Sequence, residues 1–198
     1  SRVDLYQIHT PLGRWSKPAF VTALADAVNA GLTRAVGVSN FNLEKTRQAH
    51  EALQTAGVPL ASNQVEYSLF DRRIENNGLL DYCLEQGITI IAYSPLAKGM
   101  ATGKYGPDNP PPGPRKRMYP PEKLQQAQPL IALLKEISAA RGKSPAQVAL
   151  NWTICKGTVP IPGAKNARQA ADNLGAMGWR LSPEEVLALD QASNLLEP

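Results

Sequence analysis

Five polar side chains follow short runs of apolar or small residues in this sequence: His9, Ser39, Asn40, Gln64 and Tyr93. Enzymes built on parallel strands place their chemistry where such strands end. An imidazole at His9 can donate a hydrogen bond to a substrate carbonyl oxygen while negative charge develops on that oxygen. Ser39, Asn40 and Gln64 carry the donors and acceptors that hold a carboxamide, and Tyr93 offers a flat face to a planar ring. The spacing therefore predicts a site along the rim of a parallel barrel.

Each of these residues also has a purely structural interpretation. His9 can be a hydrogen-bonded structural histidine, and Tyr93 can be a core tyrosine. The three amide-binding candidates can serve as ordinary turn and cap residues. The second histidine, His50, lies within a helical pattern and is interpreted as a surface or packing residue.

An alternation of strands and helices must position these side chains. β-Branched and small residues predict strands over residues 4–9, 35–38, 60–67, 88–92 and 158–161. Apolar spacing, closing glycines and helix starts at Ser16, Asn42, Ser144, Asn166 and Ser182 predict the helices. They run over residues 18–30, 43–56, 79–84, 122–141, 146–154 and 167–173, with a last helix from residue 183. The fold class is therefore α/β: a (β/α)8 TIM barrel of which about the last five β/α units are present.

One segment interrupts this alternation. Residues 95–121 hold eight prolines and several glycines, which make a regular element improbable through the middle. A long loop rich in proline and glycine is therefore predicted over residues 96–121. Loops of this length in compact domains are usually functional or disordered.

Composition narrows the class of protein. The 198 residues are 43% hydrophobic and 19% charged, with a net charge of +4, as in globular proteins of the soluble class. No apolar run approaches the roughly 20 residues that cross a bilayer, and the basic cluster at 115–117 lacks interleaved aromatics, so neither a membrane span nor nucleic-acid binding is expected. Cys83 and Cys155 have no metal-ligand spacing and are predicted to be reduced and buried.

The order of the motifs resembles the aldo-keto reductase superfamily, and the likeness runs nearly end to end. Its motifs are Asp4–His9, Gly37–Phe41, Asn63–Tyr67, Ala92–Leu96 and Ile161–Lys165, the last followed by Gln169, Asp172 and Asn173. Each motif is short, but five in the right order make the resemblance specific. The loop segments Gly113–Arg115 and Pro120–Glu122 are most similar to plant and algal plastid-type members.

The resemblance implies a dinucleotide cofactor. His9 would orient the substrate carbonyl, the amide-binding residues would hold the nicotinamide carboxamide, and Tyr93 would stack on the nicotinamide ring. Residues that follow the fourth and the fifth strand would hold the phosphates and the adenine. These residues are Leu96, Lys98, Gly99 and Lys104 for the pyrophosphate, Lys165 and Arg168 for the 2′-phosphate, and Gln169, Asp172 and Asn173 for the adenine, and Ser94 and Gly163 are further candidates for binding the cofactor. Two cations near the 2′-phosphate favour NADPH over NADH, although Lys98, Lys104 and Arg168 can equally be solvated surface charges.

The resemblance also implies a tyrosine proton donor, tuned by a lysine and an aspartate, that would precede Ser1. Tyr6, Tyr67 and Tyr93 do not occupy its motif. We therefore expect the chain to be the C-terminal part of a longer protein and to be inactive alone. Trp15 is the single candidate for the substrate pocket.

Two functions remain open at this point. The parent protein can be an NADPH-dependent oxidoreductase that reduces the carbonyl of a small aldehyde or ketone. Alternatively, it can be a non-catalytic nucleotide-binding or auxiliary subunit that docks onto a larger complex. A bare structural β/α domain would leave the order of polar strand ends unexplained. The resemblance suggests a plastid location, and a cytoplasmic one otherwise.

Overall fold

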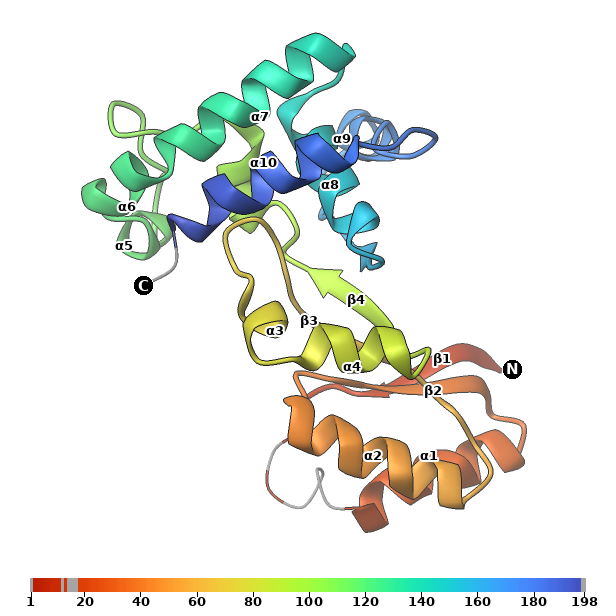
Figure 1. The fold of residues 1–198 in the computed structure, drawn as a ribbon. Helices are drawn as coiled ribbons and strands as arrows, with labels where there is room; N and C mark the ends of the chain where they lie inside the picture. The colour runs from red at the N-terminus through yellow and green to blue at the C-terminus, as the bar shows by residue number, and fades with distance from the viewer. Residues whose placement is uncertain (1, 12, 14–17, 197–198) are drawn as a thin grey trace. The chain divides into compact units, whose positions relative to one another are not determined.

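The structure, a computed structural model, describes residues 2–11, 13 and 18–196 (Figure 1). By its internal contacts the chain divides into two compact units, Ser1–Glu66 with Arg73–Ile91 and Tyr67–Arg72 with Ala92–Pro198. Five strands form a sheet in chain order, β1-β2-β3-β4-β5. Strand β4 begins in the first unit and ends in the second. The fold class predicted from the sequence, α/β, is confirmed.

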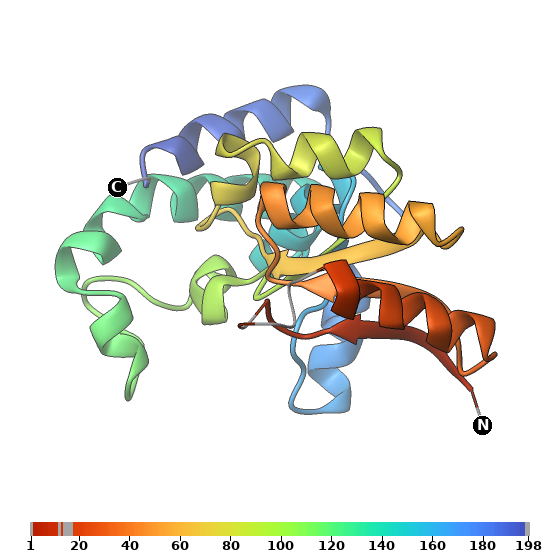
Figure 2. The same ribbon diagram turned by 90° about the horizontal axis from the view of Figure 1, so that it is seen from below.

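The first unit alternates strands and helices. Its elements are β1 (Val3–Ile8), α1 (Pro18–Asn29), β2 (Thr33–Ser39), α2 (Leu43–Thr55), β3 (Leu60–Glu66), α3 (Arg73–Asn76), α4 (Leu79–Glu85) and the start of β4 (Thr89–Tyr93). Strands β1 and β2, and β2 and β3, pair in parallel. Helices α1 and α2 lie side by side and contact β2 and β3, respectively (Figure 1 and Figure 2).

The core of the first unit lies between this strand layer and its helices. Val36 and Val38 of β2 are fully buried, as are Ala49 and Leu53 of α2. Asn42 caps α2, since its side-chain oxygen accepts a hydrogen bond from the Lys45 N–H at 3.0 Å. The strand predicted at 35–38 and the cap predicted at Asn42 are confirmed. Trp15 and the predicted helix cap at Ser16 lie outside the described residues.

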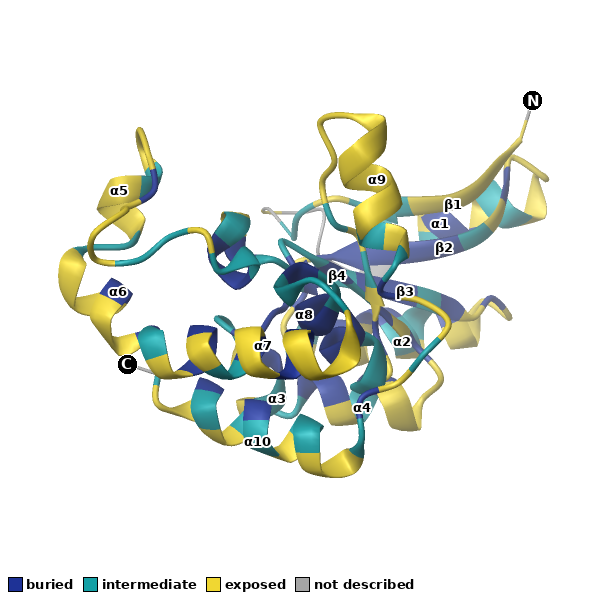
Figure 3. Cartoon of the chain, turned by 90° about the horizontal axis from the view of Figure 1, so that it is seen from above, coloured by how far each residue is buried: buried dark blue, intermediate teal, exposed yellow. Residues whose placement is uncertain are grey.

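The second unit is mainly helical. Its elements are the end of β4, the 3-10 helix η2 (Ala97–Thr102), α5 (Arg115–Met118), α6 (Pro121–Gln126), α7 (Gln128–Arg141), α8 (Pro145–Cys155), β5 (Val159–Pro160), α9 (Ala167–Leu174) and α10 (Pro183–Asn194). Ser144 and Ser182 form capping boxes at α8 and α10, and Asn166 caps α9, as their sequence patterns predict. Figure 3 shows that α8 is largely buried and α9 largely exposed.

Three predictions in this unit need correction. The single helix predicted over 122–141 is two helices that meet at Ala127, because Pro129 has no N–H to continue the helical ladder. The loop predicted over 96–121 contains η2 and α5, while its middle holds the isolated bridge between Gly106 and Asn109. Cys155, predicted to be buried, is partly exposed because it is the last residue of α8.

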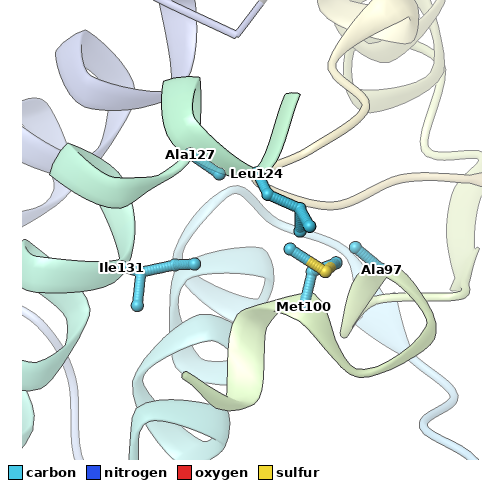
Figure 4. Packing of buried hydrophobic residues seen from close by; sticks show 5 residues of the cluster. All are labelled: Ala97, Met100, Leu124, Ala127 and Ile131. Atoms are coloured by element: carbon cyan, nitrogen blue, oxygen red, sulfur yellow. The ribbon is translucent and has the colours of Figure 1, made fainter. Parts of the chain in front are cut away.

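Buried apolar residues join the predicted loop to the helices that follow it. Met100 of η2 faces Leu124 and Ala97, and Ile131 of α7 completes the group with Ala127 (Figure 4). Met100 is 1% exposed and Leu124 is also 1% exposed. The start of the loop is thus fixed by core packing.

A buried charged cluster joins segment 67–72 to α8 and α10. Trp152 of α8, which is fully buried, donates from Nε1 to Asp190 Oδ1 at 2.8 Å. Arg72 donates to the Asp190 carbonyl oxygen at 2.8 Å and lies 3.5 Å from the Asp190 carboxylate. On its other side Trp152 packs against Tyr67, with ring centroids 5.2 Å apart.

Candidate functional site

The predicted amide-binding residues meet at the end of β2 in the first unit. Asn40 follows the strand with φ at 60°, a left-handed conformation that asparagine tolerates better than most residues. Its N–H donates to the Gln64 carbonyl oxygen at 2.9 Å, and its Nδ2 donates to the His9 carbonyl oxygen at 3.1 Å and to Ser39 Oγ at 3.1 Å. Ser39 Oγ donates to the same Gln64 carbonyl at 2.8 Å. The structure therefore brings His9, Ser39, Asn40 and Gln64 together in one hydrogen-bonded turn.

These bonds determine which of the four side chains still have a hydrogen-bond donor or acceptor available for a ligand. Ser39 is 2% exposed, its hydroxyl proton is committed to Gln64 and one lone pair accepts from Asn40 Nδ2, so toward a ligand it can present only one acceptor lone pair. The His9 imidazole is exposed, and neither it nor the Gln64 side-chain amide has a hydrogen-bond partner among the described residues. His9 and Gln64 are thus the two side chains of this turn that are ready to bind a ligand.

The second histidine has a partner. His50 of α2 lies 2.9 Å from the Tyr82 hydroxyl through Nδ1, with the Arg47 guanidinium 4.5 Å from the centre of the Tyr82 ring. Burial raises the pKa of Tyr82, an effect that Arg47 opposes. His50 therefore joins two helices by packing, as the sequence indicated.

In the second unit, Tyr93 ends β4 and leads into a turn with unusual backbone geometry. Ser94, Ala97 and Lys98 have φ values of 51°, 47° and 55°, which non-glycine residues seldom adopt, and Gly99 follows at 103°. Such conformations persist only where the surroundings hold them, and they cluster at functional sites. The predicted pyrophosphate-binding residues therefore lie on a preformed turn.

Two side chains of the loop that follows donate hydrogen bonds to carbonyl groups of this turn. Arg115 Nη1 donates to the Lys98 carbonyl oxygen at 2.9 Å, and the Tyr119 hydroxyl donates to the Ala97 carbonyl oxygen at 3.1 Å. No carboxylate lies within 4.0 Å of the Lys98, Lys104 or Arg115 cations in the described part of the chain. Arg115 belongs to the basic cluster at 115–117, for which the sequence predicted no binding role; its place after Gly113-Pro114 is the local signal for the position it takes.

The residues predicted for the adenosine end lie around the start of α9. The Lys165 N–H donates to Gln169 Oε1 at 2.7 Å, and Asn173 Nδ2 donates to the Gly163 carbonyl oxygen at 3.5 Å. Lys165 is exposed, as is Arg168. These bonds shape the strand-to-helix turn and leave two cations at its surface.

Asp172 differs from its neighbours on α9. Its carboxylate accepts from Gln147 Nε2 at 3.0 Å and from Ser144 Oγ at 3.3 Å, both at the start of α8. Gln147 Nε2 also donates to the Asp172 carbonyl oxygen at 2.8 Å. In this structure Asp172 attaches α9 to α8, a role that its helical spacing alone did not reveal.

A cavity of about 600 Å³ opens between α8, β5 and α9. Its walls are mainly apolar, with Leu174, Met177 and Trp179 among them, and Asn173 is the one predicted site residue that lines it. An apolar wall does not suit phosphate oxygens, which require donors or cations. The predicted phosphate-binding residues lie outside this lining.

Two further properties follow from the described residues. No three His, Cys, Asp or Glu side chains among them gather closely enough to hold a metal ion. Within the same residues, none of the helices has the length and apolar character required to span a bilayer.

Comparison with known proteins identifies relatives over nearly the whole chain. The pyridoxal reductase of Arabidopsis thaliana chloroplasts is 47% identical over 170 residues, which are 86% of this chain and 46% of that protein. The NADP(+) aldo-keto reductase yakc of Schizosaccharomyces pombe is 32% identical over 203 residues, covering 98% of this chain and 58% of that protein. Among solved structures, the glycerol dehydrogenase of Gluconobacter oxydans matches with a TM-score of 0.85 and 27% identity, over 100% of this chain and 61% of that one.

The chain thus spans between 46% and 61% of the length of these relatives. The sequence model of the aldo/keto reductase family matches residues 1–194. The resemblance inferred from the motifs is confirmed, and the relatives support an oxidoreductase. The chain belongs to the aldo/keto reductase family.

Proposed function

We propose that the full-length protein containing this chain is an NADPH-dependent reductase of aldehydes or ketones. The observation that carries the proposal is the turn in which His9, Ser39, Asn40 and Gln64 are joined, with the His9 imidazole and the Gln64 amide presented without partners among the described residues. Names of relatives, a pyridoxal reductase and an NADP(+) reductase, support the same chemistry.

The donor set of the chain fits this cofactor. When bound, NADPH supplies a hydride for a carbonyl carbon. The Gln64 amide and the Asn40 turn hold the carboxamide, and Tyr93 provides the stacking face. His9 donates a hydrogen bond to the carbonyl oxygen and stabilises the charge that develops there. The proton donor that the family resemblance implies, a tyrosine, belongs in this proposal to the remainder of the full-length protein.

Cations and main-chain groups of the second unit are proposed to bind the phosphates and the adenine of the cofactor. Lys98 and Lys104, with the Leu96–Gly99 turn, bind the pyrophosphate. Lys165 and Arg168 bind the 2′-phosphate, and Gln169 and Asn173 face the adenine. Asp172 supports this end indirectly, because its carboxylate already accepts from α8.

Replacing His9 tests the catalytic role. In the full-length protein, His9→Gln should lower kcat about 100-fold or more with pyridoxal and other aldehydes, since loss of one oxyanion donor has effects of that order. The dissociation constant for NADPH, measured by quenching of protein fluorescence, should change little. His50→Gln is the matched control and should retain the parent kcat. A His9→Gln protein with normal kcat contradicts the mechanism, and NADPH binding without turnover of any carbonyl favours the auxiliary-subunit alternative.

Replacing Lys165 tests the choice of cofactor. Lys165→Glu should weaken NADPH binding about tenfold or more, the equivalent of one charge-assisted hydrogen bond, and should affect NADH far less. Lys123→Glu makes the same charge change on α6 and should alter neither. Equal effects of Lys165→Glu on the two dinucleotides would reject the 2′-phosphate role.

We also propose a plastid location for the full-length protein, on the strength of the chloroplast relative at 47% identity. A fluorescent protein fused to the C-terminus of the full-length protein should accumulate in plastids. A cytoplasmic signal from that fusion would contradict this location.

A further inference from the structure

A buried amide lies directly behind the amide-binding turn. Asn63 of β3 immediately precedes Gln64 and is fully buried. Its Nδ2 donates to the Phe41 carbonyl oxygen at 2.9 Å and to Thr46 Oγ1 at 3.0 Å. Thr46 is also fully buried, and its hydroxyl donates a hydrogen bond to the Asn42 carbonyl oxygen at 2.8 Å. One side chain of β3 thereby fixes the two peptide groups that link the turn to α2.

The two carbonyl groups belong to Phe41 and Asn42, the two residues that follow Asn40. On the N-terminal side of Asn40, the Ser39 hydroxyl and the Asn40 N–H bond to the Gln64 carbonyl at 2.8 and 2.9 Å. On its C-terminal side, the bonds from Asn63 and Thr46 hold the chain. The left-handed conformation of Asn40, with φ at 60°, is therefore held from both sides by β3 and the first turn of α2.

The two hydrogen bonds that Asn63 donates, to the Phe41 carbonyl and to Thr46, require an amide. A primary amide supplies two N–H donors from one nitrogen, whereas a carboxylate of the same shape supplies none. Asn63 Oδ1 has no hydrogen-bond partner in the part of the chain that the structure describes. A buried acceptor without a partner is unfavourable, so packing alone would favour an apolar residue here. The amide nitrogen, with its two bonds into the turn, is what distinguishes Asn63 from an apolar residue.

We propose that Asn63, acting with Thr46, is a positioning residue for the nicotinamide carboxamide. It holds Asn40 in the left-handed conformation and so sets the arrangement of Asn40, Ser39 and Gln64 around the amide. The inference rests on the carboxamide-binding role proposed above for those three residues.

The test measures how well the full-length protein distinguishes a carboxamide from an acetyl group. Dissociation constants are measured by fluorescence quenching for NADPH and for its 3-acetylpyridine analogue, in which an acetyl group without N–H donors replaces the carboxamide. Their ratio is the discrimination factor. Asn63→Leu should lower this factor about tenfold, the equivalent of about one buried hydrogen bond. Thr46→Val, which keeps the side-chain shape and removes the hydroxyl, should lower it severalfold.

Asn151 provides a matched control in the second unit. It is also fully buried, and its amide is fully bonded: Nδ2 donates to the Ala176 and Trp179 carbonyls and Oδ1 accepts from the Leu181 N–H, each at 2.9 Å, and Oδ1 also accepts from Cys155 Sγ at 3.4 Å. Asn151→Leu removes a buried amide of equal size but should keep the parent discrimination factor. Any general loss of stability would appear in both asparagine variants.

Three results would overturn the proposal. The first is a discrimination factor that is the same as that of the parent protein, both for Thr46→Val and for every Asn63→Leu sample that is folded. The second is a crystal structure of Thr46→Val or Asn63→Leu in which Asn40 keeps its positive φ and its bond to His9. The third is a full-length parent protein that binds both dinucleotides equally, which would refute the carboxamide role itself and the positioning role with it.

Discussion

Asp190→Ala removes the centre of the buried charged cluster in the second unit. The Asp190 carboxylate accepts from Trp152 Nε1 at 2.8 Å and from Lys156 Nζ at 3.2 Å, and it lies 3.5 Å from the Arg72 guanidinium. The Asp190 side chain is 19% exposed and that of Arg72 is 9% exposed. After the change, a fully buried indole N–H loses its acceptor and the nearly buried Arg72 cation loses the Asp190 carboxylate.

The magnitude follows from these two losses. A buried donor left without an acceptor costs about 1–3 kcal/mol. Removing one partner of a buried ion pair costs about 3–5 kcal/mol, but much of that charge penalty is relieved here because Asp190 is partly solvated. Arg72 also keeps its bonds to the residue-190 carbonyl and to Asn194 Oδ1, at 2.8 and 2.6 Å. We therefore expect the free energy of unfolding to fall by about 3 kcal/mol.

Urea unfolding followed by tryptophan fluorescence measures this loss, because Trp152 reports on the cluster itself. Asp190→Asn keeps an acceptor for the indole and should cost about half as much. Asp4→Ala is the exposed control, since the Asp4–Arg34 pair is 3.3 Å long with side chains 85% and 63% exposed, and such pairs contribute about 0–1 kcal/mol. A loss of less than about 1 kcal/mol for Asp190→Ala, or one equal to that of Asp4→Ala, would refute this reasoning.

Three further predictions concern packing, cysteine reactivity and pH. Gly37→Ala should destabilise the protein by about 1–3 kcal/mol in urea unfolding, because a Cβ there overlaps Ser62 Oγ and lies 3.0 Å from the Ser62 carbonyl oxygen. Adding Ser62→Ala should recover part of this loss of stability, and an absence of recovery would contradict the overlap. Burial raises the pKa of the Cys83 thiol to about 12, so iodoacetamide at pH 8 should label the partly exposed Cys155 in the folded protein and spare Cys83; equal labelling rates, read by mass spectrometry, would contradict this. The hydrogen bond from Arg141 of α7 lowers the pKa of Glu185. The stabilisation that this pair contributes is therefore full above the ordinary pKa of about 4.3 and is lost as the pH falls through the lowered pKa. Between about pH 5 and 3 the parent protein should lose more stability than Glu185→Gln, and parallel pH curves would show that the pair contributes nothing.

The helix starts and the order of strands followed from the sequence because they depend on neighbouring residues. Asn42, Asn166, Ser144 and Ser182 each cap a helix through an N–H three residues ahead, so the signal and its structural effect lie within one turn. The positions of His9, Asn40, Gln64 and Tyr93 at or beside strand ends were predictable for the same reason. Pro129 is an equally local signal, and its missing N–H is the reason that the structure has α6 and α7 where one helix was predicted.

What those side chains bond to depended on the tertiary structure. Asn40 reaches the His9 carbonyl across 31 residues, and Arg72 reaches Asp190 across 118. Nothing within one turn of Ser39 showed that its proton is committed to Gln64, or that Asp172 would bond to α8. Residue types and short spacings establish which groups are available, because capping and strand formation are local. Which donor meets which acceptor is settled only when parallel strands and packed helices bring distant segments within 3 Å or so, the range over which hydrogen bonds form.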